Sequence, residues 1–224
     1  NIRERFPSTK THWLPNGVDL DFYNPQKIKA NGFRKKNNLS ESDIVFFYGG
    51  ILGHAQGLQV VLEAAKIVNK NEDVKIILQG AGPEREMLME LNEELNLSNV
   101  LFLPPVAKNE MPGILKEVDV ALVPLRKLDI FQGAIPSKIF EALAMKKALL
   151  LGVDGEARHH FIDKARAGLF FEPENSIDLA KNIIELANNR AQIAEMGERA
   201  RAYVQTNFNR DNISKDFLEI LNNN

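Results

Sequence analysis

From Asp43 onward, short apolar runs alternate with longer amphipathic segments, and this alternation restricts the fold more than any other feature of the chain. Strands are predicted at 44–50, 74–80, 100–103, 118–124, 148–153 and 168–171. Helices are predicted between them at 57–69, 84–95, 110–117, 136–145 and 156–165. Strands that alternate with helices over short connections form parallel sheets covered on both faces. We therefore predict an α/β fold with a doubly wound, parallel, six-stranded Rossmann-like sheet in the order 3-2-1-4-5-6.

The pattern changes after the sixth predicted strand, where three helices follow at 176–188, 190–205 and 209–221 without intervening strands. Ser176 and Asp178 are expected to cap the first of them. The last carries Ile213, Phe217 and Leu221, more apolar surface than a peripheral helix needs unless something beyond this domain covers it. The polar, basic segment 26–42 predicts a solvated surface helix rather than a membrane or phosphate patch.

Composition excludes several classes of protein. The chain has no cysteine, which rules out disulfides and thiol chemistry, and its net charge of -2 argues against a nucleic-acid partner. No apolar run approaches the roughly 20 residues that span a bilayer. We expect a cytoplasmic protein, with any peripheral membrane contact made outside this chain. The four histidines, His12, His54, His159 and His160, have no metal-binding spacing, so no metal is expected.

The stretch 131–145, FQGAIPSKIFEALAM, is the strongest candidate for a binding site. Pro136 at a first helical position leaves the next N–H groups free to bind an anion. Ser137 and Glu141 are four residues apart and project from the same side of the helix. This arrangement is expected of a site for a phosphorylated ligand that also carries hydroxyl groups. The alternative for Glu141 is a surface ion pair with Lys138.

A glycine-rich loop follows the first predicted strand and contains Gly49, Gly50, Gly53 and Gly57. Glycines allow a backbone to approach a phosphate closely. Their spacing, GGxxG, differs from the GxGxxG of dinucleotide sites, and Gln79 stands where an acidic residue would hold a ribose. A nicotinamide or flavin dinucleotide is therefore not expected, and the Walker lysine pattern is also absent.

Six segments in order resemble the C-terminal donor-binding domain of retaining GT-B glycosyltransferases of family 4, the glycosyl transferases group 1. They read LPNGVDLDFYNP, FFYGGILGHAQGLQVVLEA, VKIILQGAGPE, VLFLPPVAKNEMPGIL, VDVALVPL and IPSKIFEALAMKKALLL. The nearest subgroup carries the motifs GxxGxxQG and PSKxFE and acts on N-acetylated sugars in cell-surface polysaccharide assembly. The resemblance covers nearly the whole chain from Trp13.

The resemblance implies transfer of a hexosyl or N-acetylhexosaminyl group, with retention, from a nucleotide-sugar to a glycan or lipid-linked acceptor. The donor would be a UDP-sugar, with no further cofactor and no metal. In the family a glutamate at the position of Glu141 binds the ribose hydroxyls. The other donor-binding positions are Gly49, Gly50 and Gly53 with Ser137 and Lys138 at the diphosphate, Val106 near the base, and Gln56, which either orients a phosphate or sugar or closes its own loop.

Two departures from the family pattern leave the catalytic residues unassigned. Gly133 stands where many relatives have a glutamate near the donor sugar, and Gly50 and Gln56 replace a basic pair. The negative charge of the diphosphate would then be compensated by backbone amides, by Lys138 or Arg126, or by another domain. Two alternatives stay open: a sugar-nucleotide epimerase of the same fold, and a non-catalytic nucleotide-sugar-binding domain.

The resemblance also divides the chain. Residues 1–25 are expected to be the end of a missing N-terminal domain with the interdomain linker, 26–207 the nucleotide-sugar-binding domain, and 208–224 a helix that crosses to the N-terminal domain. His54 could touch the ligand, and Glu156 could approach the donor or cap its helix. Trp13 and Phe47 are expected to pack in the core or linker.

Overall fold

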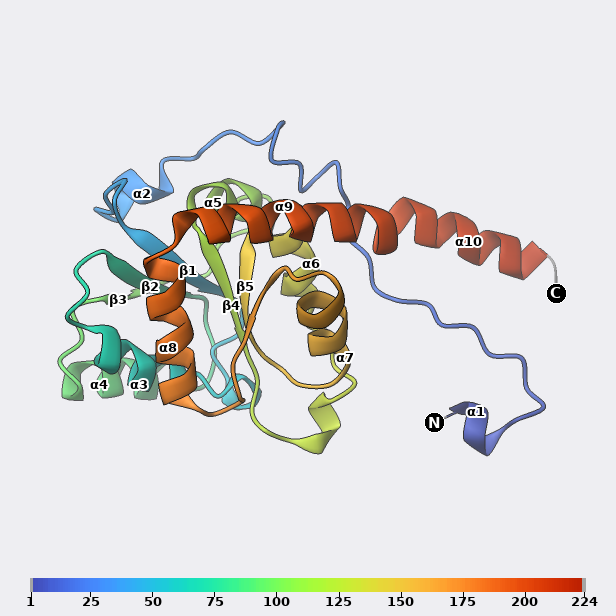
Figure 1. The fold of residues 1–224 in the computed structure, drawn as a ribbon, viewed down its shortest axis with the longest axis horizontal. Helices are drawn as coiled ribbons and strands as arrows, with labels where there is room; N and C mark the ends of the chain where they lie inside the picture. Colours follow the sequence, from blue (N-terminus) through green and yellow to red (C-terminus); the bar gives the residue numbers. More distant parts are fainter. Residues whose placement is uncertain (1, 223–224) are drawn as a thin grey trace.

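The computed structural model describes residues 2–222 and contains one six-stranded parallel sheet (Figure 1). The strands are β1 Ile44–Gly49, β2 Val74–Gln79, β3 Val100–Leu103, β4 Val120–Pro124, β5 Ala148–Gly152 and β6 Gly168–Phe170. Their order is β3-β2-β1-β4-β5-β6, which confirms the predicted doubly wound topology. The switch in strand order lies between β1 and β4, so the loops that follow these two strands meet at the same edge of the sheet.

Two hydrophobic cores lie on the two faces of this sheet. Helices α3 (Gln59–Val68), α4 (Arg85–Glu94) and α8 (Ser176–Ala187) cover one face. Helices α5 (Met111–Glu117) and α6 (Ser137–Ala144) cover the other, and α9 (Arg190–Asn207) contributes to both cores. Successive β1 residues alternate between the cores, with Phe46 in one and Phe47 in the other. This is why the strands read as continuous apolar runs.

Helix α7 (Glu156–Arg158) is much shorter than predicted and continues as a π-helical segment, η3 (His159–Lys164).

The N-terminal caps of two helices also differ from the prediction. Pro136 is the N-cap of α6 rather than its first helical residue. The cap of α8 is Asn175, whose side chain accepts from the Asp178 N–H at 3.0 Å, so the prediction that Ser176 and Asp178 cap this helix was wrong. The Asp178 carboxylate instead accepts from the Glu172 N–H.

The surface helix predicted over 26–42 was also wrong. Only a single turn forms, α2 (Phe33–Lys36), because Gly32 before it and Asn38 after it adopt left-handed backbone conformations. Phe33 is buried and packs edge-on against Phe47, which fixes the turn to the sheet. The Glu117 carboxylate caps this turn by accepting from the backbone N–H groups of Asn31, Phe33 and Arg34 at 2.8–3.1 Å.

Glu117→Gln should therefore destabilise the fold in a pH-dependent way. Burial acts to raise the pKa of Glu117, but the N–H donors of Phe33, Arg34 and Asn31 outweigh it and hold the pKa below its usual 4.5. A carboxyl with a lowered folded-state pKa contributes stability above its unfolded pKa and loses it as the pH falls through the folded value. We expect a deficit of about 1 kcal/mol at pH 7 in urea denaturation, shrinking toward pH 3. An equal deficit at both pH values would contradict this.

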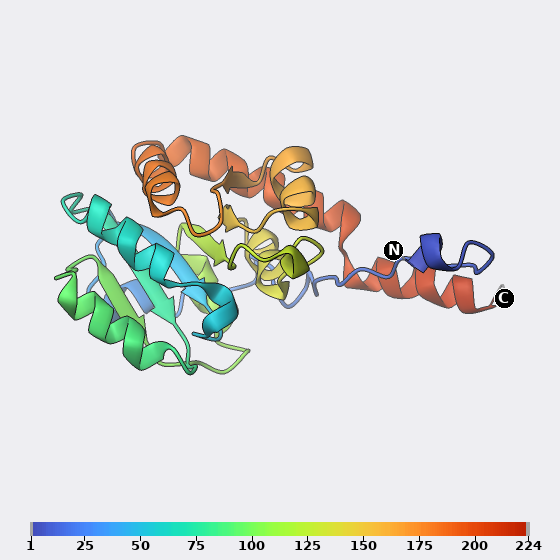
Figure 2. The same cartoon turned by 90° about the horizontal axis from the view of Figure 1, so that it is seen from below.

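The two ends of the chain project away from the sheet on the same side (Figures 1 and 2). They are α1 (Ile2–Arg5) with the segment after it, and α10 (Arg210–Asn222). Phe217 and Leu221 on α10 are exposed and Ile213 is half-buried, so the predicted exposure is confirmed for two of the three. Trp13 is 60% exposed and stacks on His160, whereas Phe47 is a core residue. Within residues 2–222, no helix has the length and apolar character to cross a membrane.

Candidate functional site

The glycine loop after β1 extends the sheet beyond its last regular residue. The Gly50 N–H donates to Gln79 O and the Leu52 N–H donates to Ala81 O, both at 2.9 Å. This pairing needs glycine on the opposite side, since a Cβ on Gly80 would lie 1.8 Å from Gly50 O. The amides of Gly50 and Leu52 are therefore engaged in backbone pairing, and Gly49 is still part of β1. The loop places Gly50 beside Lys138 of α6, but the amides of Gly50 and Leu52 are not free to bind a phosphate.

The remainder of this loop is a short 3-10 turn, η1 (His54–Gln56), held by its neighbours. Arg126, just after β4, donates from Nη1 to His54 Nε2 at 2.8 Å, and His54 Nδ1 lies 3.0 Å from Glu84 Oε1. A guanidinium can only donate, so Nε2 accepts and Nδ1 carries the proton given to Glu84. Gln56 Oε1 lies close to Gly53. His54 thus clamps three loops together.

The start of α6 carries an unpaired positive charge. Pro136 offers no side-chain cap, and the Lys138 ammonium lies 3.7 Å from the centre of the Tyr48 ring. Among residues 2–222 it has no hydrogen-bond or ion-pair partner. Burial lowers the pKa of Lys138 to about 8, against a weaker opposite effect of Glu141. A half-buried cation without a hydrogen-bond or ion-pair partner, next to a helix N-terminus, is suited to bind an anion.

Gly50 makes room for this ammonium. A Cβ on Gly50 would lie 2.7 Å from Lys138 Nζ, and Gly50 has a φ of 147°, which side chains rarely adopt. The cation of the site therefore reaches the end of β1 from α6 and not from the glycine loop. Ser137, one residue earlier, is exposed at the same helix start.

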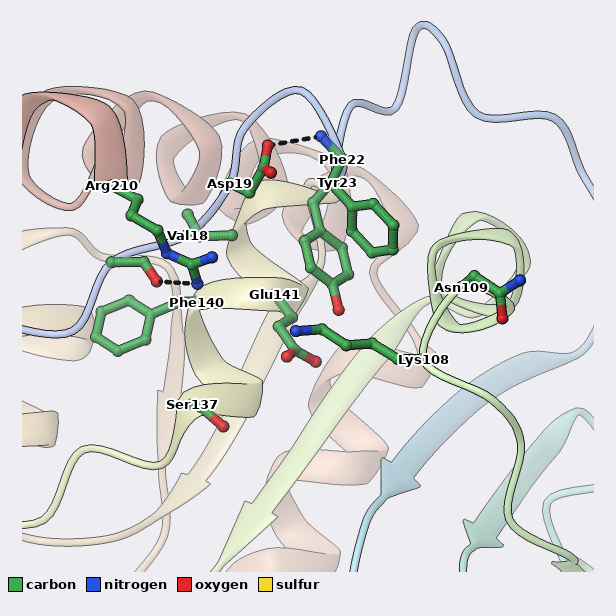
Figure 3. Close-up of a pocket in the computed structure, with 11 residues that line it drawn as sticks. Val18, Asp19, Phe22, Tyr23, Lys108, Asn109, Ser137, Phe140, Glu141 and Arg210 are labelled. Atoms are coloured by element: carbon green, nitrogen blue, oxygen red, sulfur yellow. Dashed lines mark hydrogen bonds between the residues drawn. The ribbon is translucent and has the colours of Figure 1, made fainter.

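A cavity of about 360 Å³ opens beside Glu141, one turn further along α6 (Figure 3). Its lining residues are Gly17, Val18, Asp19, Phe22, Tyr23, Lys108, Asn109, Ser137, Phe140, Glu141 and Arg210. The Glu141 carboxylate accepts no hydrogen bond that meets normal geometry within the described part of the chain. Burial raises the pKa of Glu141, and the nearby Tyr23, Lys108, Lys138 and Arg210 oppose that rise. The cavity thus combines a free acceptor with surrounding cations and aromatic walls.

One wall of the cavity comes from residues 17–23, which the sequence analysis treated only as a linker. Val18 forms a bridge with Asn209, with Val18 N–H donating to Phe208 O at 2.9 Å and Arg210 N–H to Val18 O at 3.1 Å. The buried guanidinium of Arg201 donates to Tyr23 O at 2.7 Å and to Ala144 O at 2.8 Å. Arg201 therefore joins this segment to the end of α6, the helix that carries Glu141.

The structure brings some of the predicted site residues together and separates others. Ser137 and Glu141 line the cavity, while Gly49, Gly50 and Lys138 lie close to one another beside it. Val106 packs against the core, and Lys108 and Asn109 of the same loop line the cavity instead. Glu156 starts α7, and its N–H donates to Gln132 O. Across residues 2–222, no three His, Asp or Glu side chains are grouped as metal ligands would be.

Sequence reasoning missed Phe22, Tyr23 and Arg210. The first two lie more than 110 positions before Glu141, and only the aromatic pair after the Asn16-Gly17 turn could have drawn attention to them. Arg210 begins α10, and its guanidinium donates to Gly17 O at 3.0 Å.

Comparison with known proteins agrees with this fold. The family model described as Glycosyl transferases group 1 matches residues 30–203. A GDP-mannose-dependent alpha-(1-6)-phosphatidylinositol monomannoside mannosyltransferase of Mycobacterium tuberculosis is 23% identical over 220 residues, which are 96% of this chain and 56% of the relative. The chain spans about half the length of the curated relatives it matches.

Solved structures give the same picture. A glycosyltransferase from Rickettsia africae superposes with a TM-score of 0.82 at 18% identity, over 98% of this chain and 60% of that one. HepE from Anabaena, in complex with UDP and glucose, has a TM-score of 0.78 at 20% identity, over 93% of this chain and 56% of that one. The fold is thus that of GT-B glycosyltransferases. Because the family model matches well over half of its residues, this chain belongs to the glycosyl transferases group 1.

Proposed function

We propose that this chain is the donor-binding part of a retaining glycosyltransferase that moves a sugar from a UDP-sugar to a glycan or lipid-linked acceptor. The observation that carries the proposal is the pair on α6: the Lys138 ammonium and the Glu141 carboxylate, neither of which is neutralised by a partner, one turn apart beside a nucleoside-sized cavity. Ligand sites in proteins are typically cavities of about 300–1,000 Å³ with a few convergent polar groups.

Each group has a chemical match in a nucleotide-sugar. The Glu141 carboxylate can accept from two ribose hydroxyls, and the Lys138 ammonium with the start of α6 complements the diphosphate. Lys108 and Arg210 at the cavity rim add positive charge. The complex of HepE with UDP and glucose, on the same fold, supports a UDP-sugar as the donor. The mycobacterial relative is named for GDP-mannose, so the base has to be decided by experiment.

The chemistry of transfer follows from the leaving group. The bond between the anomeric carbon and the phosphate oxygen breaks, and the acceptor hydroxyl oxygen forms a new bond to that carbon on the same face. The hydroxyl proton passes to the departing phosphate oxygen, and the nucleoside diphosphate leaves. Lys138 and the α6 amides would stabilise the charge that develops on the diphosphate, without a protein nucleophile. The acceptor, a glycan or a lipid-linked sugar, would be bound by a domain that pairs with this one, in the cytoplasm or at a membrane surface.

One observation favours a second candidate, a domain that binds a nucleotide-sugar without transferring it. A Cβ built on Gly133 meets no atom within 4 Å, so a carboxylate side chain would fit at this position, yet the chain has a glycine there. A transferase and a binding domain would make the same contacts with the nucleotide-sugar, but only the transferase would transfer the sugar to an acceptor.

Calorimetric titration of the 224-residue chain with UDP, GDP and ADP tests the proposal. We expect one site that prefers UDP, competed by UDP-glucose and UDP-N-acetylglucosamine. A folded chain, verified by circular dichroism, that binds none of the three nucleotides would contradict the function. Binding of GDP in preference to UDP would correct the donor and leave the site assignment intact.

A further inference from the structure

The Tyr23 hydroxyl is a buried polar group without a partner. Tyr23 is only 3% exposed, and its hydroxyl oxygen has no hydrogen-bond partner among residues 2–222. A buried hydroxyl that forms no hydrogen bond is unfavourable, because it has lost its water without replacement. The same side chain lines the cavity beside Glu141 (Figure 3). The orphan hydroxyl therefore lies where a ligand could satisfy it.

The hydroxyl and the Glu141 carboxylate face one another across the cavity wall (Figure 3). Burial raises the pKa of Tyr23 most, and Glu141 raises it further through its charge and its approach to the hydroxyl. The two groups are therefore close, but they do not form a hydrogen bond of normal geometry. Tyr23 thus stays protonated and can donate, while Glu141 can accept. Lys108 crosses the same space, but it is exposed and forms no hydrogen bond within the described residues, so a ligand can displace it.

The backbone fixes Tyr23 in this position. Its carbonyl accepts from Arg201 Nη1 at 2.7 Å, and its N–H donates to Asp19 O at 3.0 Å. Arg201 also donates to Ala144 O at the end of α6, so it fixes the position of Tyr23 relative to Glu141. The Tyr23 O–H is thus a preorganised donor next to the free Glu141 acceptor. A ligand hydroxyl group matches this pair, because it can accept one hydrogen bond and donate another.

We propose that Tyr23 is a specificity residue of the donor site: its O–H donates to one ribose hydroxyl of the nucleotide, and that hydroxyl donates to Glu141. This inference rests on the proposed function. It makes residues 17–23 part of the recognition site, and it predicts selection of ribonucleotides over their deoxy analogues.

Tyr23→Phe tests the proposal because it removes the hydroxyl and keeps the ring. Wild type and variant are titrated with UDP, 2′-deoxy-UDP and 3′-deoxy-UDP, and with the matching guanine nucleotides if GDP binds better. We expect Tyr23→Phe to weaken binding of the ribonucleotide about tenfold and to leave at least one deoxy analogue unchanged. Without ligand, the melting temperature should stay the same or rise, since an unsatisfied group is gone.

Tyr203→Phe is the matched control, because the Tyr203 hydroxyl is paired with His160 Nδ1 at 3.1 Å and lies outside the cavity. It should lower the melting temperature and leave nucleotide affinity unchanged. Unchanged affinity of Tyr23→Phe for the ribonucleotide would overturn the inference, as would an equal loss for all three ligands, which indicates a structural effect. A wild type that binds no nucleoside diphosphate would instead overturn the proposed function and, with it, this inference.

Discussion

Glu141→Ala should weaken UDP binding about 100-fold. The carboxylate is the free acceptor of the cavity, and hydrogen bonds to a charged group contribute about 1.5–3 kcal/mol each, so losing two ribose contacts removes roughly this factor. Calorimetry at pH 7 measures the change directly. The free chain should not lose stability through the missing charge, because burial already raises the pKa of Glu141 and so opposes its ionised form.

Glu63→Ala is the control for this experiment, since Glu63 lies exposed on α3, which covers the opposite face of the sheet. It should bind UDP like the wild type. If Glu141→Ala also binds UDP normally, the carboxylate is not the ribose ligand and the site assignment fails. Glu141→Gln sharpens the result, because an amide keeps one acceptor and should bind with an intermediate affinity.

Lys138→Met should weaken UDP binding by at least tenfold and change the affinity for uridine little, because the ammonium lies at the start of α6, where we propose that the diphosphate binds. In the wild type the UDP affinity should fall as the pH rises through about 8, the pKa of Lys138 in the free chain, since the neutral amine loses its attraction for phosphate. We expect about a tenfold fall between pH 7 and pH 9.5, and no such fall in Lys138→Met.

Lys138 affects the stability of the free chain in the opposite direction: the UDP affinity falls as the pH rises, whereas the stability increases. Its folded-state pKa is below the usual 10.5, so the unfolded chain binds more protons between about pH 8 and 10.5, and stability rises with pH in that range. Lys147→Met is the matched control, because Lys147 is also half-buried with a pKa near 8 but donates to Val118 O at the opposite end of the strands. It should alter stability and leave UDP affinity intact. A pH-independent UDP affinity in the wild type would exclude Lys138 as the diphosphate cation.

The sheet was predictable because each strand carries its own signal. Runs such as 44–50 and 148–153 are apolar on both faces, and only a covered parallel sheet accommodates six of them in alternation with helices. The start of α6 was predictable for a similar reason, since Pro136, Ser137 and Glu141 are neighbours in sequence. The free acceptor and the helix N-terminus could thus be found without coordinates.

The rest of the site depends on contacts between distant residues. Tyr23 meets Glu141 only because Arg201 and the Val18–Asn209 bridge hold residues 17–23 against α6 and α10. The clamp of Glu84, His54 and Arg126 joins three loops, so no local pattern reveals it. Segment 26–42 was misread because its polar composition hid one buried anchor, Phe33, and because left-handed residues at both ends of α2 limit it to one turn.

Because Lys138 packs against Gly50, the residue at one of these positions limits which residue can stand at the other. A side chain at position 50 would both strain the backbone and meet the Lys138 ammonium, so the effects of substitutions at the two positions are coupled. An alignment read column by column would record position 50 as one that lacks a basic residue. In three dimensions a positive charge does lie beside position 50, and it comes from Lys138, 88 positions later in the sequence.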